Sequence, residues 1–129
     1  MVVFDSWALL AYLSAEPAAD RVESVWIDNG AAISSINLGE VLYIRIRSDG
    51  EDSARTDVEK AAELLEVIDP DWALVAEAAR IKAGGGVSYA DAFCIATALR
   101  VEAPLWTGDP EIVERAADYS YEVVDLRTT

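Results

Sequence analysis

The chain has 129 residues, of which 53% are hydrophobic, and it carries a formal net charge of −14 at pH 7. This length suits a single domain, residues 1–129, with a buried core, and the hydrophobic share excludes a disordered chain. The apolar runs are far shorter than the roughly 20 residues that a membrane-spanning helix needs, and no signal-peptide pattern opens the chain, so we expect a cytoplasmic protein without a membrane segment.

Short apolar runs alternate with segments whose apolar residues recur at helical spacing. We expect strands at Val2–Phe4, Ala31–Ser34, Glu66–Asp69, Leu105–Thr107 and Tyr121–Leu126. We expect helices at about 7–14, 18–29, 37–47, 53–65, 72–82, 88–101 and 110–117. This alternation predicts an α/β fold with a central, mainly parallel sheet of four or five strands and helices on both faces.

Four acidic residues lie where the chain passes into an expected helix. Asp5 and Asp109 follow two of the predicted strands, whereas Glu40 and Asp91 fall in the first turns of helices. In an open α/β sheet such junctions gather at one edge, which is where ligands bind. Carboxylates that meet there repel one another unless a positive charge joins them, and no lysine or arginine directly neighbours any of the four in sequence. A divalent cation is the simplest partner for them.

Each of these acids also has an ordinary explanation at the start of a helix. The two that follow strands are suitable N-caps. Asp91 follows Ser88 by three residues, as in a capping box, and Glu40 follows Asn37 at the same spacing. Glu40 and Asp91 nevertheless lie among apolar residues, where a carboxylate is rarely buried without a partner.

The chain contains no histidine and one cysteine, Cys94. Ser-His-Asp and Cys-His catalysis, RNA cleavage by a histidine pair and histidine-bound zinc are therefore excluded within the chain. Cys94 cannot form an internal disulfide or a thiolate metal cluster, and its apolar neighbours predict a buried packing role.

The net charge argues against a general affinity for a phosphate backbone. Acidic residues are densest from Asp49 to Glu77, a segment that we interpret as a solvated face; a docking surface for a basic partner is the alternative. The cations that are candidates for contacts to a polyanion include Arg45, Arg47, Arg80, Lys82 and Arg100.

Four sequence blocks carry the acids together with their neighbours: Val3–Ser6, Ile36–Val41, Ser88–Ala98 and Leu105–Asp109. In their order and spacing they resemble the signature blocks of the PIN domain, and above all those of the VapC-like toxin ribonucleases of type II toxin–antitoxin pairs. The resemblance runs over nearly the whole chain. It implies a three-layer α/β/α sandwich, an endoribonuclease that depends on Mg²⁺ or Mn²⁺, neutralisation by a cognate antitoxin protein, and a homodimer.

The positions that match the acidic site of the family are Asp5, Glu40, Asp91 and Asp109, and Thr107 matches its polar residue before the last acid. We expect the three aspartates to hold the metal directly or through water, and Glu40 to bind the metal or to orient the attacking water. A second ion could stabilise the leaving oxygen of the RNA substrate. The Thr107 hydroxyl would hold an aspartate, a water or a phosphate oxygen; a bond to the backbone is its ordinary alternative.

Two other classes of function stay open at this point. A receiver-type phosphoacceptor domain is also a small acidic α/β protein with a Mg²⁺ pocket. It usually needs paired acids after the first strand and a lysine after the last, and neither Phe4–Ser6 nor Val124–Leu126 supplies them. The third class is a non-catalytic module whose acids dock a basic protein.

Four aromatic residues of the early helices are candidates for contact with a partner segment. They are Trp7, Tyr12, Trp26 and Tyr43. They form either a hydrophobic groove or part of the core, and we favour the core because aromatic residues at helical spacing are usually buried.

Overall fold

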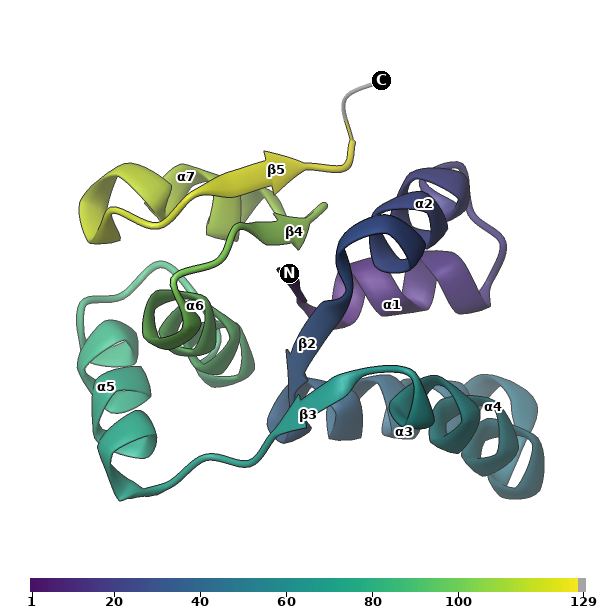
Figure 1. Ribbon diagram of the computed structural model, residues 1–129. Helices are drawn as coiled ribbons and strands as arrows, with labels where there is room; N and C mark the ends of the chain where they lie inside the picture. Colours follow the sequence, from purple (N-terminus) through teal and green to yellow (C-terminus); the bar gives the residue numbers. More distant parts are fainter. Residues whose placement is uncertain (128–129) are drawn as a thin grey trace.

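The computed structural model describes residues 1–127 and confirms the expected α/β/α sandwich (Figure 1). Its described residues form one parallel sheet in the order β3-β2-β1-β4-β5. The strands are β1 (Val2–Phe4), β2 (Ala31–Ser34), β3 (Glu66–Ile68), β4 (Leu105–Thr107) and β5 (Val123–Asp125). The chain builds the sheet outward from β1 to β3, then returns to add β4 and β5 on the other side of β1.

Helices cover both faces of this sheet (Figure 1). They are α1 (Ser6–Leu13), α2 (Ala19–Asn29), α3 (Ser35–Asp49), α4 (Glu51–Glu63), α5 (Trp72–Ala83), α6 (Tyr89–Val101) and α7 (Pro110–Tyr119). The first four pack on one face and the last three on the other. Within the described residues, no helix is both long enough and apolar enough to cross a membrane.

Strand β1 shows how the two helical layers share the sheet. Val2 and Phe4 pack with helices α1 to α4, while Val3 between them packs with α5 to α7. Successive side chains of a strand point to opposite faces, and each of these three is at most 5% exposed. A strand buried on both faces needs an unbroken apolar run, which is what the sequence provides.

Two of the segment boundaries that differ from the expectations have a clear physical cause. Helix α4 begins at Glu51 because Gly50, at φ +87°, both ends α3 and precedes α4; glycine adopts this conformation at little cost. The last strand is shorter than expected because Tyr121 turns inward before it begins. Its hydroxyl donates a hydrogen bond to the Ile112 carbonyl of α7.

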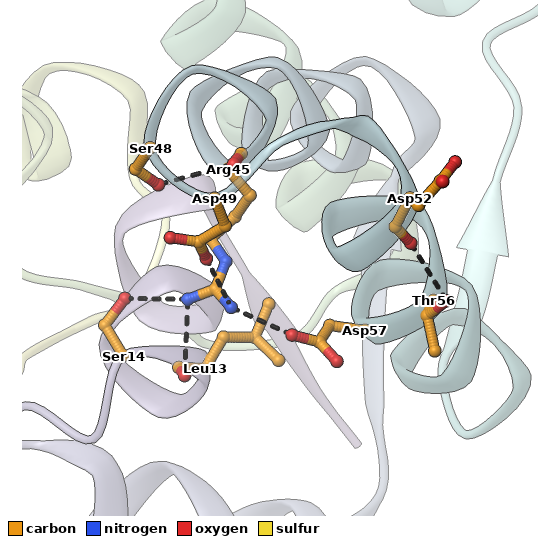
Figure 2. Close-up of polar contacts among 8 residues, drawn as sticks. All are labelled: Leu13, Ser14, Arg45, Ser48, Asp49, Asp52, Thr56 and Asp57. Carbon is orange, nitrogen blue, oxygen red and sulfur yellow. Dashed lines mark hydrogen bonds and ion pairs between the residues drawn. The ribbon is translucent and has the colours of Figure 1, made fainter.

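Arg45 joins three helices on the α1–α4 face (Figure 2). Its guanidinium group donates to the Leu13 carbonyl at 3.4 Å and to the Ser14 hydroxyl at 3.3 Å, at the end of α1. It also pairs with Asp49 of α3 and Asp57 of α4, each at 2.9 Å. With its side chain 12% exposed, Arg45 belongs to the scaffold and is not a ready contact for a polyanion.

Replacing Arg45 with alanine should lower the free energy of unfolding by about 1–3 kcal/mol, because the change removes partly buried hydrogen bonds and the packing of the side-chain stem. Arg55→Ala is the matched control. Arg55 is 54% exposed in its pair with Glu59 on α4, and such pairs contribute about 0.5 kcal/mol or less. Urea unfolding followed by circular dichroism compares the two, and equal losses would contradict a scaffold role for Arg45.

Candidate metal centre

The candidate site lies at the edge of the sheet where β1 and β4 end. These two strands are neighbours, and the order of the chain reverses between them. At such a point the helices that follow leave on opposite faces, which opens a crevice beyond the strand ends. Asp5 follows β1 and Thr107 ends β4, so both side chains lie at this crevice.

Asp5 caps α1 and also binds the end of β4. Its Oδ1 accepts a hydrogen bond from the Ala8 amide at 2.9 Å, and its Oδ2 accepts one from the Thr107 hydroxyl. The same Thr107 oxygen accepts a hydrogen bond from the Asp109 amide at 2.9 Å. Burial raises the pKa of Asp5 to about 7, although the bonds from Thr107 and Ala8 oppose the shift.

Asp91 lies in the first turn of α6, where it forms the expected capping box with Ser88. The Asp91 amide donates to Ser88 Oγ at 3.1 Å, and the Asp91 carboxylate accepts from the Ser88 amide at 3.4 Å. Burial raises the pKa of Asp91 to about 6, and the negative charges of Asp109 and Glu40 contribute to the same increase. The carboxylate therefore lies within the electrostatic reach of two acids on other helices.

Glu40 lies further into α3 than the sequence suggested. The helix begins directly after Ser34, whose hydroxyl oxygen accepts a hydrogen bond from a first-turn amide at 3.2 Å. The expected capping role of Asn37 is therefore wrong. Asn37 is instead fully buried and donates from its side chain to the Ala90 carbonyl at 2.9 Å, which holds α3 against the start of α6.

Two buried oxygens on this part of α3 have no hydrogen-bond partner among the described residues. They are Oε1 of Glu40 and Oδ1 of Asn37. Buried polar atoms nearly always have a partner, and an exception commonly indicates an ordered water or an ion. The Glu40 oxygen is the more informative of the two, because its carboxylate charge acts on Asp91.

Glu111 joins the acids that the sequence singled out. Asp109 caps α7 by accepting a hydrogen bond from the Glu111 amide at 2.9 Å. One carboxylate oxygen from each of Asp91, Asp109 and Glu111 lies within 4.8 Å of the others. In the sequence, Glu111 resembles any acid that complements a helix N-terminus. Its position two residues after Asp109 was the only sequence signal for a place in the cluster. That position does not distinguish an acid that complements the helix N-terminus from one that binds a cation.

Gly108 sets the turn between the last two site residues of the chain. A side chain there would collide with the indole ring of Trp7, which lies directly against the glycine backbone. Glycine is the residue that permits such an approach. Trp7 thus supports the turn that carries Thr107 and Asp109.

The five site residues expected from the sequence therefore meet at one edge of the sheet: Asp5, Glu40, Asp91, Thr107 and Asp109. Among the described residues, none of their carboxylates forms an ion pair with a lysine or arginine. A set of crowded, oxygen-only donors suits a hard divalent cation such as Mg²⁺ or Mn²⁺. Such an ion would offset the repulsion between the acids.

Comparison with known proteins agrees with this geometry. The family model of the PIN domain matches residues 2–118. The chain belongs to the PIN domain family. Among curated proteins, none matches the sequence closely enough to count as a relative.

Several solved structures share the fold of this PIN domain. A chain of a toxin–antitoxin complex from Klebsiella pneumoniae aligns with a TM-score of 0.72 and 20% identity, over 98% of each chain. A chain of DNA-bound VapBC from Salmonella typhimurium aligns with a TM-score of 0.77 and 20% identity, over 98% of this chain and 99% of that one. VapC20 of Mycobacterium tuberculosis, a sarcin–ricin loop cleaving toxin, aligns with a TM-score of 0.72 and 14% identity, over 88% of this chain and 94% of that one.

Without divalent cations, the stability of the chain should receive a contribution from these acids that falls as pH rises from about 4 to about 7. The folded state keeps protons on Asp5 up to about pH 7 and on Asp91 up to about pH 6, whereas their ordinary pKa is 3.8. Each group then lowers stability by up to about 1.4 kcal/mol per pH unit within its own window. Asp5→Asn removes one of the two ionisations. The free energy of unfolding of this variant should therefore fall less steeply with pH than that of the wild type, as measured by urea unfolding in EDTA across this pH range.

Asp52→Asn provides the control, because Asp52 is exposed in the first turn of α4 and the change in charge is the same. Its pH profile should follow that of the wild-type chain. If the free energy of unfolding of Asp5→Asn fell with pH as steeply as that of the wild type, the raised pKa of Asp5 would be wrong.

Proposed function

We propose that this PIN domain is a metal-dependent endoribonuclease and the toxin component of a type II toxin–antitoxin pair. The observation that carries the proposal is the meeting of Asp5, Asp91 and Asp109 at the sheet edge. Burial and mutual repulsion raise the pKa of the first two, and no described lysine or arginine pairs with any of the three. An acidic site of this kind suits a cation that brings a phosphodiester to it.

The residues of the chain divide the work as follows. Asp91, Asp109 and Glu111 lie close enough to share one cation, and Asp5 would hold it directly or through water. Glu40, with an unpartnered buried oxygen, orients the attacking water as a base. Thr107 fixes the Asp5 carboxylate through its hydroxyl. When bound, Mg²⁺ or Mn²⁺ supplies a nucleophilic water and offsets charge on the scissile phosphate.

The structural relatives support this function and weaken one alternative. One neighbour is described as a sarcin–ricin loop cleaving toxin, and another comes from a toxin–antitoxin complex. The PIN match over residues 2–118 argues against a receiver-type phosphoacceptor domain. A non-catalytic acidic module is the competing function that an assay must separate. We further propose that the protein acts in the cytoplasm, as a homodimer.

The cognate antitoxin has a suitable docking surface in a groove of about 870 Å³ between α1, α2 and α4. Tyr12 and Trp26 pack edge to face in its wall at 5.3 Å. Ile27 and Leu64 line it while 76% and 74% exposed. The rim carries the acids Asp20, Glu23 and Asp57 together with Lys60. An apolar groove with an acidic rim suits an amphipathic segment with basic residues.

The four early aromatics thus have different surroundings. Trp7, Tyr12 and Trp26 all pack against the core cluster of the α1–α4 face, as favoured from the sequence. Tyr12 and Trp26 also line the groove, so core packing and groove lining occur together for them, and their contact with a partner segment stays a prediction. The expectation of core packing is wrong for Tyr43, which is 47% exposed beneath the Arg47 guanidinium group.

Asp91→Asn should lower the rate of RNA cleavage by about a hundredfold or more, because it removes a charged ligand at the centre of the cluster. A labelled RNA pool incubated with Mg²⁺ or Mn²⁺ measures the rate. Millimolar Mn²⁺ should also raise the melting temperature of the wild-type chain more than that of the variant, since an ion that binds the folded state stabilises it. Asp52→Asn should behave as the wild type in both measurements. Cleavage at the wild-type rate by folded Asp91→Asn would favour the non-catalytic module.

Leu64→Lys should prevent formation of the complex with the cognate antitoxin while leaving RNA cleavage intact. The change places a charge in the apolar groove, and Leu64 is not one of the residues of the acid cluster. Co-purification of the two proteins measures the complex. Trp72→Lys is the control, because Trp72 is 79% exposed on α5, on the other face of the sheet. A complex that survives Leu64→Lys unchanged would place the antitoxin elsewhere.

A further inference from the structure

Most candidate cations of this acidic chain are already engaged away from the metal centre. Arg80 pairs with Glu77 at 2.6 Å, and Arg100 pairs with Asp71 at 2.8 Å. Arg45 is held in the scaffold by its bonds to α1, α3 and α4. RNA that reaches the metal centre therefore needs other positive groups, and the end of β5 supplies them.

Strand β5 places Asp125 beside the metal centre. Asp125 is the register partner of Thr107 on β4, and the Leu126 amide donates to the Thr107 carbonyl at 2.7 Å. Paired strands lie about 4.8 Å apart, so the residues that follow β5 begin one strand away from the Thr107 hydroxyl that binds Asp5.

Arg127 is fixed at this position by a two-pronged contact with Asp125. Its Nε donates to Asp125 Oδ1 at 3.0 Å, and one Nη donates to Oδ2 at 2.7 Å. The Arg127 amide donates to Oδ1 as well, at 3.0 Å. These bonds hold the guanidinium plane in one orientation, and they use two of its five N–H groups. The side chain is 45% exposed, so it is open to a further acceptor.

The charge of Arg127 reaches the metal centre. Its pKa is raised first by the hydrogen bond that it donates to Asp125, and the negative charges of Asp109 and Glu114 raise it further. Asp109 belongs to the metal centre, and Glu114 lies on the helix that Asp109 caps. Arg127 thus stands at the border of the acid cluster, where a phosphate next to the scissile one would pass.

A second arginine lies at the same edge. Arg21 of α2 stacks over the Trp106 ring of β4, with its guanidinium carbon 5.8 Å from the ring centre. Its positive charge also lowers the pKa of Asp125, after the larger effect of the Arg127 hydrogen bond. The charges of both guanidinium groups therefore act on the same carboxylate, that of Asp125.

We propose that Arg21 and Arg127 form a phosphate-binding pair that holds the RNA backbone on the β5 side of the metal centre. This inference rests on the proposed function. Asp125 and Trp106 hold the two guanidinium groups in place, and the groups donate hydrogen bonds to phosphate oxygens. The pair positions RNA and takes no part in the chemistry.

Two variants test the pair: Arg127→Gln alone, and Arg127→Gln combined with Arg21→Gln. Their charge-matched controls are Arg55→Gln on α4 alone, and Arg55→Gln combined with Arg80→Gln on α5. Single-stranded RNA of mixed sequence serves as substrate, and fluorescence anisotropy in an Asp5→Asn background measures binding to uncleaved RNA. We expect Arg127→Gln to weaken binding by about tenfold and to raise KM with little change in kcat. The plot of log binding constant against log salt should become shallower by about 0.7 for each phosphate that a variant no longer binds.

The outcomes separate the pair from the proposed function. If the wild type cleaves RNA and the Arg127 variants match the controls in KM and salt slope, the phosphate-binding pair is wrong and the nuclease stands. If the wild type binds RNA but cleaves none, the nuclease is wrong, and the variants still decide the pair by their binding constants. Absence of both binding and cleavage in the wild type would overturn both.

Discussion

The burial of carboxylates close to one another is the constraint on which the acidic edge of this PIN domain depends. Asp5 and Asp91 are 2% and 8% exposed, and each feels the negative charge of Asp109. Charges that lose water without gaining a partner cost several kcal/mol or take up a proton. The scaffold holds them together through strand pairing and helix packing, and the helix caps that Asp5 and Asp91 form add to this. The site is therefore preorganised for a cation and poorly suited to remain without one.

Helix capping and metal binding are compatible roles for the same side chain. Asp109 uses one oxygen to accept a hydrogen bond from an amide of α7. Asp91 takes part in a capping box and also lies near other acids. A cap fixes the rotation of a carboxylate, and a metal centre needs ligands that are held in fixed orientations. Each cap also places its acid at the sheet edge, because the helices start there. The ordinary explanation of these acids therefore helps to account for how they converge.

The sequence predicted most of the fold because the central strands β1 and β2 are fully buried, so their sequences are apolar runs that stand out between helical patterns. It also predicted the buried, unpaired Cys94 and the residues of the acidic edge. It did not predict the strand order, because strand adjacency depends on contacts between distant segments. Glu111 was missed because an acid in the first turn of a helix is expected for electrostatic reasons alone. Arg45 was misjudged because nothing local shows that Leu13 and Asp57 approach it from other helices.

A net charge of −14 limits how such a domain can hold a nucleic acid. Non-specific binding to a polyanion rests on many released counterions, and an acidic surface offers few such contacts. Under the proposed function, attraction for RNA is confined to a bound cation and to the pair of Arg21 and Arg127. Affinity would then be modest for RNA in general and greater for segments whose shape lets phosphates reach both places at once. The same acidity favours a basic partner, so one charge distribution would discourage indiscriminate cleavage and assist neutralisation.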